Sequence, residues 1–323
     1  MHPKVGKKTI LVTGGLGFIG SHLVDSLMNK GNVIFALDNL SNGTVKNVKQ
    51  WMGNSDFHFV KTDLLGSLES ISDLSFDIIF HFAANPEVRV SSTAPDVHFR
   101  QNVQATFKLL EFIRKTQSNS TFVFASTSAV YGEPDEIPTP EKYAPLKPIS
   151  VYGATKLASE ALITAYAHNY DFKAIICRLA NIIGPRSNHG VIYDFVHKLR
   201  QNPNELEILG DGTQTKSYLY VEDCVNAILL VLNRVMDFVE IYNVGSIDKV
   251  NVKTIAKIVT EEMELKDAKL SLTGGVDGGR GWKGDVKTML LDINRLRDLG
   301  WQPRRNSSQA VRQTAKAVIS QTT

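Results

Sequence analysis

The chain contains few cysteines and no motif typical of a metal site. Cys177 and Cys224 are its two cysteines, each inside an apolar run, and neither CxxC nor HExxH occurs in the sequence. These absences argue against a disulfide framework and against a zinc site. Two buried thiols suit a reducing compartment, so we expect a cytoplasmic protein that binds no metal.

The chain also lacks a long hydrophobic run and a strong excess of one charge. The basic leader, residues 1–8, is not followed by an extended apolar stretch, so neither a signal peptide nor a membrane span is predicted. The formal net charge is only +3, from 36 Lys and Arg against 33 Asp and Glu. So small an excess argues against a nucleic-acid surface. At 323 residues, one large domain or two domains are expected.

What the chain does contain is a nucleotide-binding pattern near its start. The apolar run Thr9 to Val12 is typical of a buried parallel strand, and it leads into a glycine loop at 13–20 and a helix from Ser21 to Lys30. Glycines let the backbone approach a pyrophosphate, and the free N–H groups of the helix attract it. A second strand, Asn32 to Leu37, ends at Asp38, near the ~20-residue spacing of a carboxylate that binds the adenosine ribose. No arginine follows Asp38 directly, which favours NAD over NADP.

The alternation of strands and helices continues over the first half of the chain. Helices are predicted between further apolar runs, the longest of them from Asp96 to Lys115. Such repeated units predict an α/β fold with a doubly wound parallel sheet, whose ligands lie beyond the carboxyl ends of the strands. The further strands predicted are Phe57–Thr62, Asp77–Phe82, Thr121–Ala125 and Lys173–Leu179. The first ends at Asp63, the second leads to Ala83 and Ala84, and the third leads to Ser126, Thr127 and Ser128.

Tyr152 and Lys156 are four residues apart on a predicted helix that reaches about His168. Residues at this spacing share one helix face, with roughly 5–6 Å between their Cβ atoms. A neighbouring ammonium favours a phenolate, so we expect the pKa of Tyr152 to fall from about 10 toward neutrality, where it can act as a general base or acid. A surface helix that carries the two residues by chance is the alternative, and the hydroxyl cluster 126–128 at the same sheet edge favours catalysis.

The regular alternation of strands and helices changes after Asn181. We therefore expect a second, smaller α/β domain over 181–323 beside a nucleotide-binding domain over 1–180. Parts of 210–250 are expected to pack back on the first domain. The elements predicted there are helices at Val191–Arg200, from Val221, at Val252–Met263, Leu291–Leu299 and Asn306–Gln321, and strands at Glu205–Leu209, Lys216–Tyr220 and Ile241–Gly245. In the first domain, His81 is interpreted as a core histidine, and Asn102 as a capping or buried hydrogen-bonding residue.

Several segments together resemble one protein family. The segments TGGLGFIG (13–20), HFAA (81–84), STS (126–128) and YGATK (152–156), with Asp38, resemble the extended short-chain dehydrogenase/reductase family, within it the nucleotide-sugar epimerases and dehydratases. Segment 210–228 is also similar to that group. The resemblance implies a Rossmann domain, bound NAD, a UDP-sugar or other nucleotide sugar in the C-terminal part, and a homodimer formed through the helices around 97–115 and 152–168.

The resemblance also implies roles for individual residues. Tyr152 matches the catalytic base, Lys156 its activator and the nicotinamide-ribose anchor, and Thr127 the hydroxyl that binds the sugar O4. The substrate-binding residues implied are Ser128, Asn181, Val191, Lys216, Tyr218, Arg280 and Asp285. The cofactor-binding residues implied are Gly14, Gly17, Phe18, Ile19, Gly20, Asp38, Asn39, Asn42, Gly43, Asp63, Leu64, Phe82, Ala83, Ala84, Asn102, Ser126, Tyr152 and Lys156.

Two positions distinguish the reactions of this group. Its dehydratases carry Asp-Glu after the catalytic threonine, where this chain has Ser128 and Ala129, and its decarboxylases usually keep a glutamate at the second position. The resemblance therefore favours a UDP-hexose 4-epimerase, with UDP-glucose and UDP-galactose first. The alternatives are an epimerase of UDP-GlcNAc or UDP-glucuronate, a dehydratase, a reductase, and a non-catalytic NAD-binding regulator.

The substrate segment departs from the family pattern at two positions. Lys216 stands where the group usually has an arginine, which keeps the charge and loses the bidentate geometry. Trp282 occupies the arginine position of the usual Arg-x-Gly-Asp element, so Arg280 is expected to reach in from two residues upstream. Met289 lies near the position at which the family gates N-acetylated sugars.

Overall fold

The computed structural model describes residues 7–88, 93–116, 119–232 and 237–321. A seven-stranded sheet forms its centre, in the order β11-β6-β5-β4-β1-β2-β3, and every neighbouring pair is parallel. The strands are β1 Thr9–Thr13, β2 Val33–Asp38, β3 Phe57–Lys61, β4 Ile78–His81, β5 Thr121–Thr127, β6 Lys173–Leu179 and β11 Val239–Val244.

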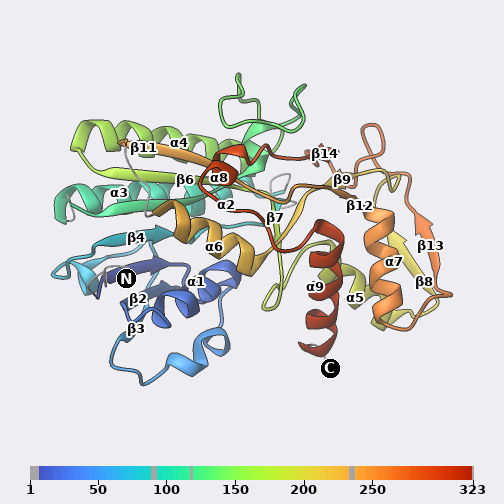
Figure 1. The fold of residues 1–323 in the computed structure, drawn as a ribbon, viewed down its shortest axis with the longest axis horizontal. Coiled ribbons are helices and arrows are strands. Elements are labelled where there is room, and N and C mark those ends of the chain that lie inside the picture. Colours follow the sequence, from blue (N-terminus) through green and yellow to red (C-terminus); the bar gives the residue numbers. More distant parts are fainter. Residues whose placement is uncertain (1–6, 89–92, 117–118, 233–236, 322–323) are drawn as a thin grey trace.

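Helices cover both faces of this sheet (Figure 1). Helices α1 (Phe18–Met28) and α6 (Val221–Leu232) lie on one face, and α3 (Ala105–Thr116) and α4 (Val151–Tyr170) on the other. Along β1, Ile10 belongs to the core under α1 and α6, whereas Leu11 belongs to the core under α3 and α4. A strand buried on both faces needs this continuous apolar run, and the predicted doubly wound fold is confirmed.

The order of the strands reverses between β1 and β4. From β1 the chain passes to β2 and β3 on one side and then returns to β4 on the other. Connections that leave in opposite directions open a crevice at the carboxyl ends of these two strands. The fold therefore places the glycine loop after β1 opposite the segment after β4.

A smaller unit with its own apolar core packs beside the sheet (Figure 1). Its helices are α5 Val191–Gln201, α7 Val252–Glu262 and α9 Ser307–Gln321, and its parallel strand pair is β8 Glu205–Ile208 with β13 Lys269–Leu272. Short strands link the two units: β7 Asn181–Ile183, β9 Thr215–Lys216, β10 Tyr218–Tyr220, β12 Val250–Asn251 and β14 Thr288–Met289. From the segment 210–250, α6 and β11 belong to the large sheet layer.

The remaining helical segments are short. They are 3-10 helices at Val45–Trp51, Glu69–Ile71 and Ser128–Tyr131, α2 at Pro95–His98, a π-helical turn at Phe99–Gln104, and α8 at Asn294–Asp298. At the start of α9, Asn306 Oδ1 accepts a hydrogen bond from the backbone N–H of Gln309 at 2.9 Å, so the predicted cap is present.

Two sequence predictions were wrong in detail. The single strand Lys216–Tyr220 is two strands, because β9 pairs with β12 and β14 whereas β10 pairs with β7. The helix predicted at 96–115 is confirmed, with a π-helical turn inside it and Phe107 43% exposed. The helix 291–299 shortens to α8, because Leu291 and Ile293 are buried in the core before it begins.

Candidate active site

One large cavity lies at the carboxyl ends of the sheet strands and extends to the smaller unit. Its volume is about 860 Å³, and loops after β1, β2, β4, β5 and β6 line it together with the start of α5. With two exceptions, Asn102 and Arg280, every residue that the sequence analysis assigned to a site lines this cavity. The parallel strands bring these residues together because all of them end at one edge.

The glycine loop after β1 leaves room for a ligand only because its residues lack side chains. Gly14 has a φ of +67°, and a Cβ there would lie 2.7 Å from the backbone N of Ala83. A Cβ on Gly20 would lie 2.1 Å from the Gly14 carbonyl oxygen. Helix α1 starts after Gly17 with no side-chain cap, so its first N–H groups face the cavity. The loop therefore fits a dinucleotide pyrophosphate.

Asp38 ends β2 at the side of this loop. Its carboxylate is buried and accepts hydrogen bonds from the backbone N–H groups of Leu16 at 3.0 Å and Leu40 at 2.8 Å. Burial raises the pKa of Asp38, and the two backbone hydrogen bonds oppose that shift. A Cβ on Gly43 would lie 2.8 Å from the carboxylate oxygens, so Gly43 keeps this acid accessible to a ribose.

Tyr152 and Lys156 extend from the first turns of α4 toward the end of β5. Ser150 caps this helix, since its Oγ accepts a hydrogen bond from the Gly153 backbone N–H at 3.1 Å. The Tyr152 hydroxyl is hydrogen-bonded to the Thr127 side chain. Lys156 Nζ donates to the carbonyl oxygen of Ala125 at 2.8 Å. One tyrosine, one threonine and one lysine thus meet at the cavity wall.

The pKa values of this pair differ from the sequence prediction. Burial raises the pKa of Tyr152 to about 12, and the bond to Thr127 opposes that rise. Burial also lowers the pKa of Lys156 to about 7, and Glu160 opposes that fall. The expected fall of the Tyr152 pKa toward neutrality is absent, because the low polarity of the buried site disfavours the charged form of both side chains. The chain alone therefore does not hold Tyr152 as a phenolate.

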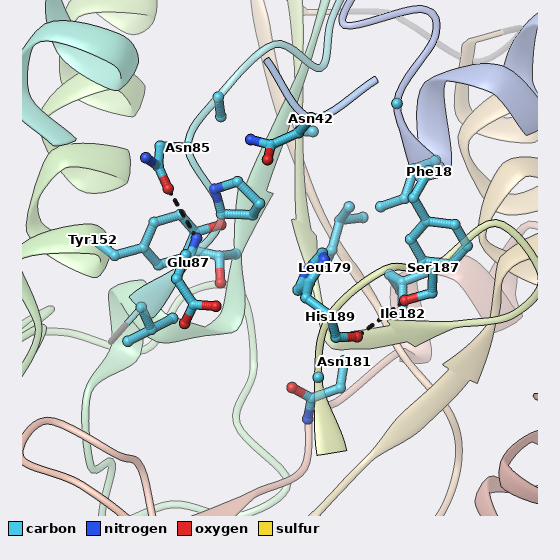
Figure 2. Close-up of a pocket in the computed structure, with 18 of the residues that line it drawn as sticks. Phe18, Asn42, Asn85, Glu87, Tyr152, Leu179, Asn181, Ile182, Ser187 and His189 are labelled. Carbon is cyan, nitrogen blue, oxygen red and sulfur yellow. Dashed lines mark hydrogen bonds between the residues drawn. The ribbon is translucent and has the colours of Figure 1, made fainter. Parts of the chain in front are cut away.

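Asn102 lies behind the cavity wall. It is buried, donates to Thr155 Oγ1 at 3.1 Å and accepts from the Asn85 backbone N–H at 2.8 Å. Asn85 in turn accepts a hydrogen bond from the backbone N–H of Glu87, beside Tyr152 (Figure 2). Asn102 is therefore a buried hydrogen-bonding residue that shapes the wall, as the sequence predicted, and its contact with the cofactor stays a prediction. Asn85 and Glu87 do line the cavity, and their position directly after β4 was the available signal.

A polar loop, residues 187–189, closes the cavity near Phe18 (Figure 2). Ser187 Oγ donates to the carbonyl oxygen of His189 at 3.1 Å, and Asn188 Nδ2 donates to the Asn42 carbonyl oxygen at 3.5 Å. The second bond joins the smaller unit to the segment after β2. Sequence reasoning missed this loop, although its polar residues follow the end of the short strand β7.

The far end of the cavity carries one ion pair. Lys216 Nζ lies 2.5 Å from the buried carboxylate of Asp285 and 5.5 Å from the ring centroid of Trp282. Arg280 does not line the cavity and is paired with Glu133, so its predicted contact with the diphosphate stays a prediction. The turn that positions Trp282 directs Arg280 to the Glu133 loop instead.

Two further predicted residues have structural partners. His81 is buried, and its ring nitrogens bond Thr13 Oγ1 at 2.8 Å and Thr106 Oγ1 at 3.0 Å, which confirms the core interpretation. The Ser126 hydroxyl donates to the buried carboxylate of Glu160.

Within the described part of the chain, no group of three or more His, Cys, Asp or Glu residues is arranged to hold a metal ion. The helices described there are all too short or too polar to cross a membrane.

Comparison with known proteins identifies the family to which the chain belongs. Residues 10–245 match the NAD dependent epimerase/dehydratase family, and the chain belongs to that family, with NAD as its cofactor. The resemblance drawn from the sequence is thereby confirmed.

Members that act on different UDP-sugars are similar to this chain. A solved UDP-galactose 4-epimerase is 44% identical, covers 97% of this chain and 99% of its own, and has a TM-score of 0.86. The UDP-glucose 4-epimerase of Mycolicibacterium smegmatis is 31% identical over 95% of this chain and 97% of its own. The UDP-glucuronic acid 4-epimerase of Bacillus cereus, solved with UDP-glucuronic acid and NAD, is 27% identical over 97% of this chain and 99% of its own, with a TM-score of 0.85.

Proposed function

We propose that the chain catalyses the NAD-dependent 4-epimerisation of a UDP-hexose, with UDP-glucose and UDP-galactose as its first substrates. The observation that carries this proposal is the set of groups at the cavity wall. Tyr152, Lys156 and Thr127 meet there, whereas the two positions after Thr127 are Ser128 and Ala129. A site without an acid at those two positions keeps the base for oxidising C4 and lacks the acid pair that the dehydratases of the group carry there for eliminating water.

The reaction needs one proton acceptor and one reversible hydride transfer. NAD, when bound, supplies the acceptor and then the donor of the C4 hydride. Tyr152 takes the proton of the C4 hydroxyl as the C4–H bond breaks, and it returns that proton when the 4-keto sugar is reduced from its other face. Thr127 orients the oxygen at C4. Lys156 and the positive charge of the oxidised nicotinamide are expected to favour the Tyr152 phenolate, which burial alone disfavours.

The diphosphate of the substrate fits the far end of the cavity. Helix α5 begins at Val191 without a side-chain cap, so its free N–H groups and its dipole favour an anion. Lys216 adds a positive charge that Asp285 holds in place. A nucleotide sugar bound there has its sugar directed toward Tyr152 and its nucleoside toward the smaller unit.

Replacing Lys216 tests this placement. In Lys216→Met, we expect the KM for the UDP-sugar to rise about tenfold, equivalent to about 1.4 kcal/mol, with kcat nearly unchanged. The reason is that the diphosphate charge is the same in the ground state and in the transition state. Lys287→Met is the matched control, since Lys287 pairs with Asp211 outside the cavity. A KM equal to that of the wild type would contradict the placement.

The substrate itself is tested by a panel of sugars. The protein with NAD is incubated separately with UDP-glucose, UDP-GlcNAc and UDP-glucuronate, and the product stereochemistry is followed by proton NMR. Met289 is buried and lines the cavity, and the resemblance puts it near the position at which the family gates N-acetylated sugars. We expect the C4 epimer to form fastest from UDP-glucose. A keto product would indicate a dehydratase, and NAD binding without turnover of any sugar would indicate a regulator.

We also propose that the protein is a homodimer formed through α3 and α4. The outer surface of these helices carries exposed aromatic rings, with Phe107 and Tyr170 each 43% exposed. Light scattering should give twice the 35.8 kDa chain mass, and Phe107→Glu should shift it toward the monomer. Met52→Glu, at an exposed apolar residue elsewhere, should leave the dimer intact. A monomer mass for the wild type would refute this proposal.

A further inference from the structure

Helix α4 and the end of β5 share a regular set of contacts. Tyr152, Lys156 and Glu160 follow one another at four-residue steps, so they lie along one face of α4. On β5, the Ala125 carbonyl oxygen accepts a hydrogen bond from Lys156. The Ser126 hydroxyl donates to Glu160, and the Thr127 side chain is hydrogen-bonded to Tyr152. Glu160 therefore belongs to the same row as the two residues assigned to catalysis.

Glu160 is an ion buried behind the cavity. Its side chain is only 5% exposed, and Arg178 on β6 donates to both carboxylate oxygens, with Nη2 at 2.7 Å and Nε at 3.1 and 3.2 Å. The remaining Arg178 donor, Nη1, bonds Tyr131 Oη and the Glu141 carbonyl oxygen, each at 3.0 Å. A bidentate pair of this kind fixes the position of the carboxylate.

Lys156 has few charged neighbours. Its ammonium lies 4.6 Å from the Phe124 ring centroid of β5. His81 on β4 also faces it, and burial with the Lys156 charge lowers the pKa of His81 to about 3, so that the imidazole is neutral. Arg178 on β6 is the other charged group nearby, and it is paired with Glu160 and does not act on the Lys156 charge. Among the described groups that act on the Lys156 charge, Glu160 is the only carboxylate.

We propose that Glu160 is a positioning residue that keeps Lys156 charged in its buried site, and that Arg178 and Ser126 hold the Glu160 carboxylate where it can do so. Glu160 touches neither the cavity nor a reacting atom, and it acts through Lys156. The inference rests on the proposed function only where turnover is concerned. Loss of the carboxylate removes the favourable neighbour of the ammonium, so Lys156 loses its proton at a lower pH.

The titration of Lys156 tests this inference directly. Lysine labelled with ¹³C at Cε is followed by NMR across pH in the NAD-bound protein, and the Lys156 signal is assigned by its absence in Lys156→Met. In Glu160→Gln, we expect the midpoint of the Lys156 titration to fall by about one pH unit, the lower end of the effect of a neighbouring opposite charge. The basic limb of the kcat profile should move to lower pH by the same interval, with the KM for UDP-glucose unchanged.

Two further variants keep the outcome interpretable. Glu160→Gln alone leaves the Arg178 charge buried without its partner. The double variant Glu160→Gln/Arg178→Met removes both charges. We expect its Lys156 titration midpoint to lie below that of the wild type as well. Glu240→Gln is the control, because Glu240 is a buried carboxylate paired with Arg295 that does not act on Lys156. A Lys156 midpoint equal to the wild-type value in both Glu160 variants would overturn the inference. Absence of epimerisation by the wild type would refute the proposed function and leave this titration valid.

Discussion

Tyr152→Phe should reduce kcat for the epimerisation of UDP-glucose by about 10³, within the 10²–10⁴ range that a positioned general base contributes. The substitution removes the hydroxyl that bonds Thr127 and keeps the ring, which packs edge-on against His98 with centroids 5.9 Å apart. Binding of NAD and of the UDP-sugar should therefore be nearly unchanged. Product formation is followed by proton NMR at saturating substrate.

A second tyrosine on the same helix provides the control. Tyr166 bonds Glu111 at 2.8 Å on the outer side of α4, away from the cavity. Tyr166→Phe should keep kcat within about twofold of the wild type, since its hydroxyl takes no part in the reaction. A kcat for Tyr152→Phe within tenfold of the wild type would show that another group transfers the proton.

Gly14→Ala should abolish NAD binding at ordinary concentrations. The new Cβ would lie 2.7 Å from the Ala83 backbone N and 2.9 Å from the Ala83 Cα, both of them backbone atoms that cannot yield. The loop must then shift from the pyrophosphate position, and we expect the Kd for NAD to rise at least about 100-fold, equivalent to about 2.7 kcal/mol. Isothermal titration calorimetry measures this change.

The backbone strain of a side chain at positive φ must be separated from the loss of the pyrophosphate site. Gly31 also has a positive φ, +77°, but a Cβ there would meet nothing within 4 Å. Gly31→Ala should therefore lower stability by a small amount, as Gly14→Ala does through its own φ, and leave the Kd for NAD unchanged. Equal affinity of the two variants for NAD would contradict the assignment of the loop.

The first strands of the sheet could be predicted from the sequence because their signals are local. Each of β1, β2 and β5 is a short apolar run that ends at a glycine, an acid or a hydroxyl, as expected for a parallel strand buried on both faces. The position of β11 could not be predicted in this way. It pairs with β6, and no local feature of the sequence encodes that distant partner.

The differences between the sequence predictions and the structure have the same origin. Residues 216–220 alternate like one strand, but Lys216 pairs with β12 and β14 and Tyr218 pairs with β7, so tertiary contacts divide the segment at Ser217. Motif spacing placed Arg280 beside the diphosphate, whereas its ion pair with Glu133 holds it elsewhere. The elevated pKa of Tyr152 arises from burial, which sequence spacing does not report.

The central claim is that hydride leaves C4 of the sugar and returns to the same carbon. UDP-glucose deuterated at C4 is incubated with the protein and NAD in ordinary water, and the product is analysed by NMR and mass spectrometry. We predict UDP-galactose that retains deuterium at C4, because the hydride never exchanges with solvent. Galactose that has lost its deuterium to solvent, or no C4 epimer at all, would contradict the proposed reaction.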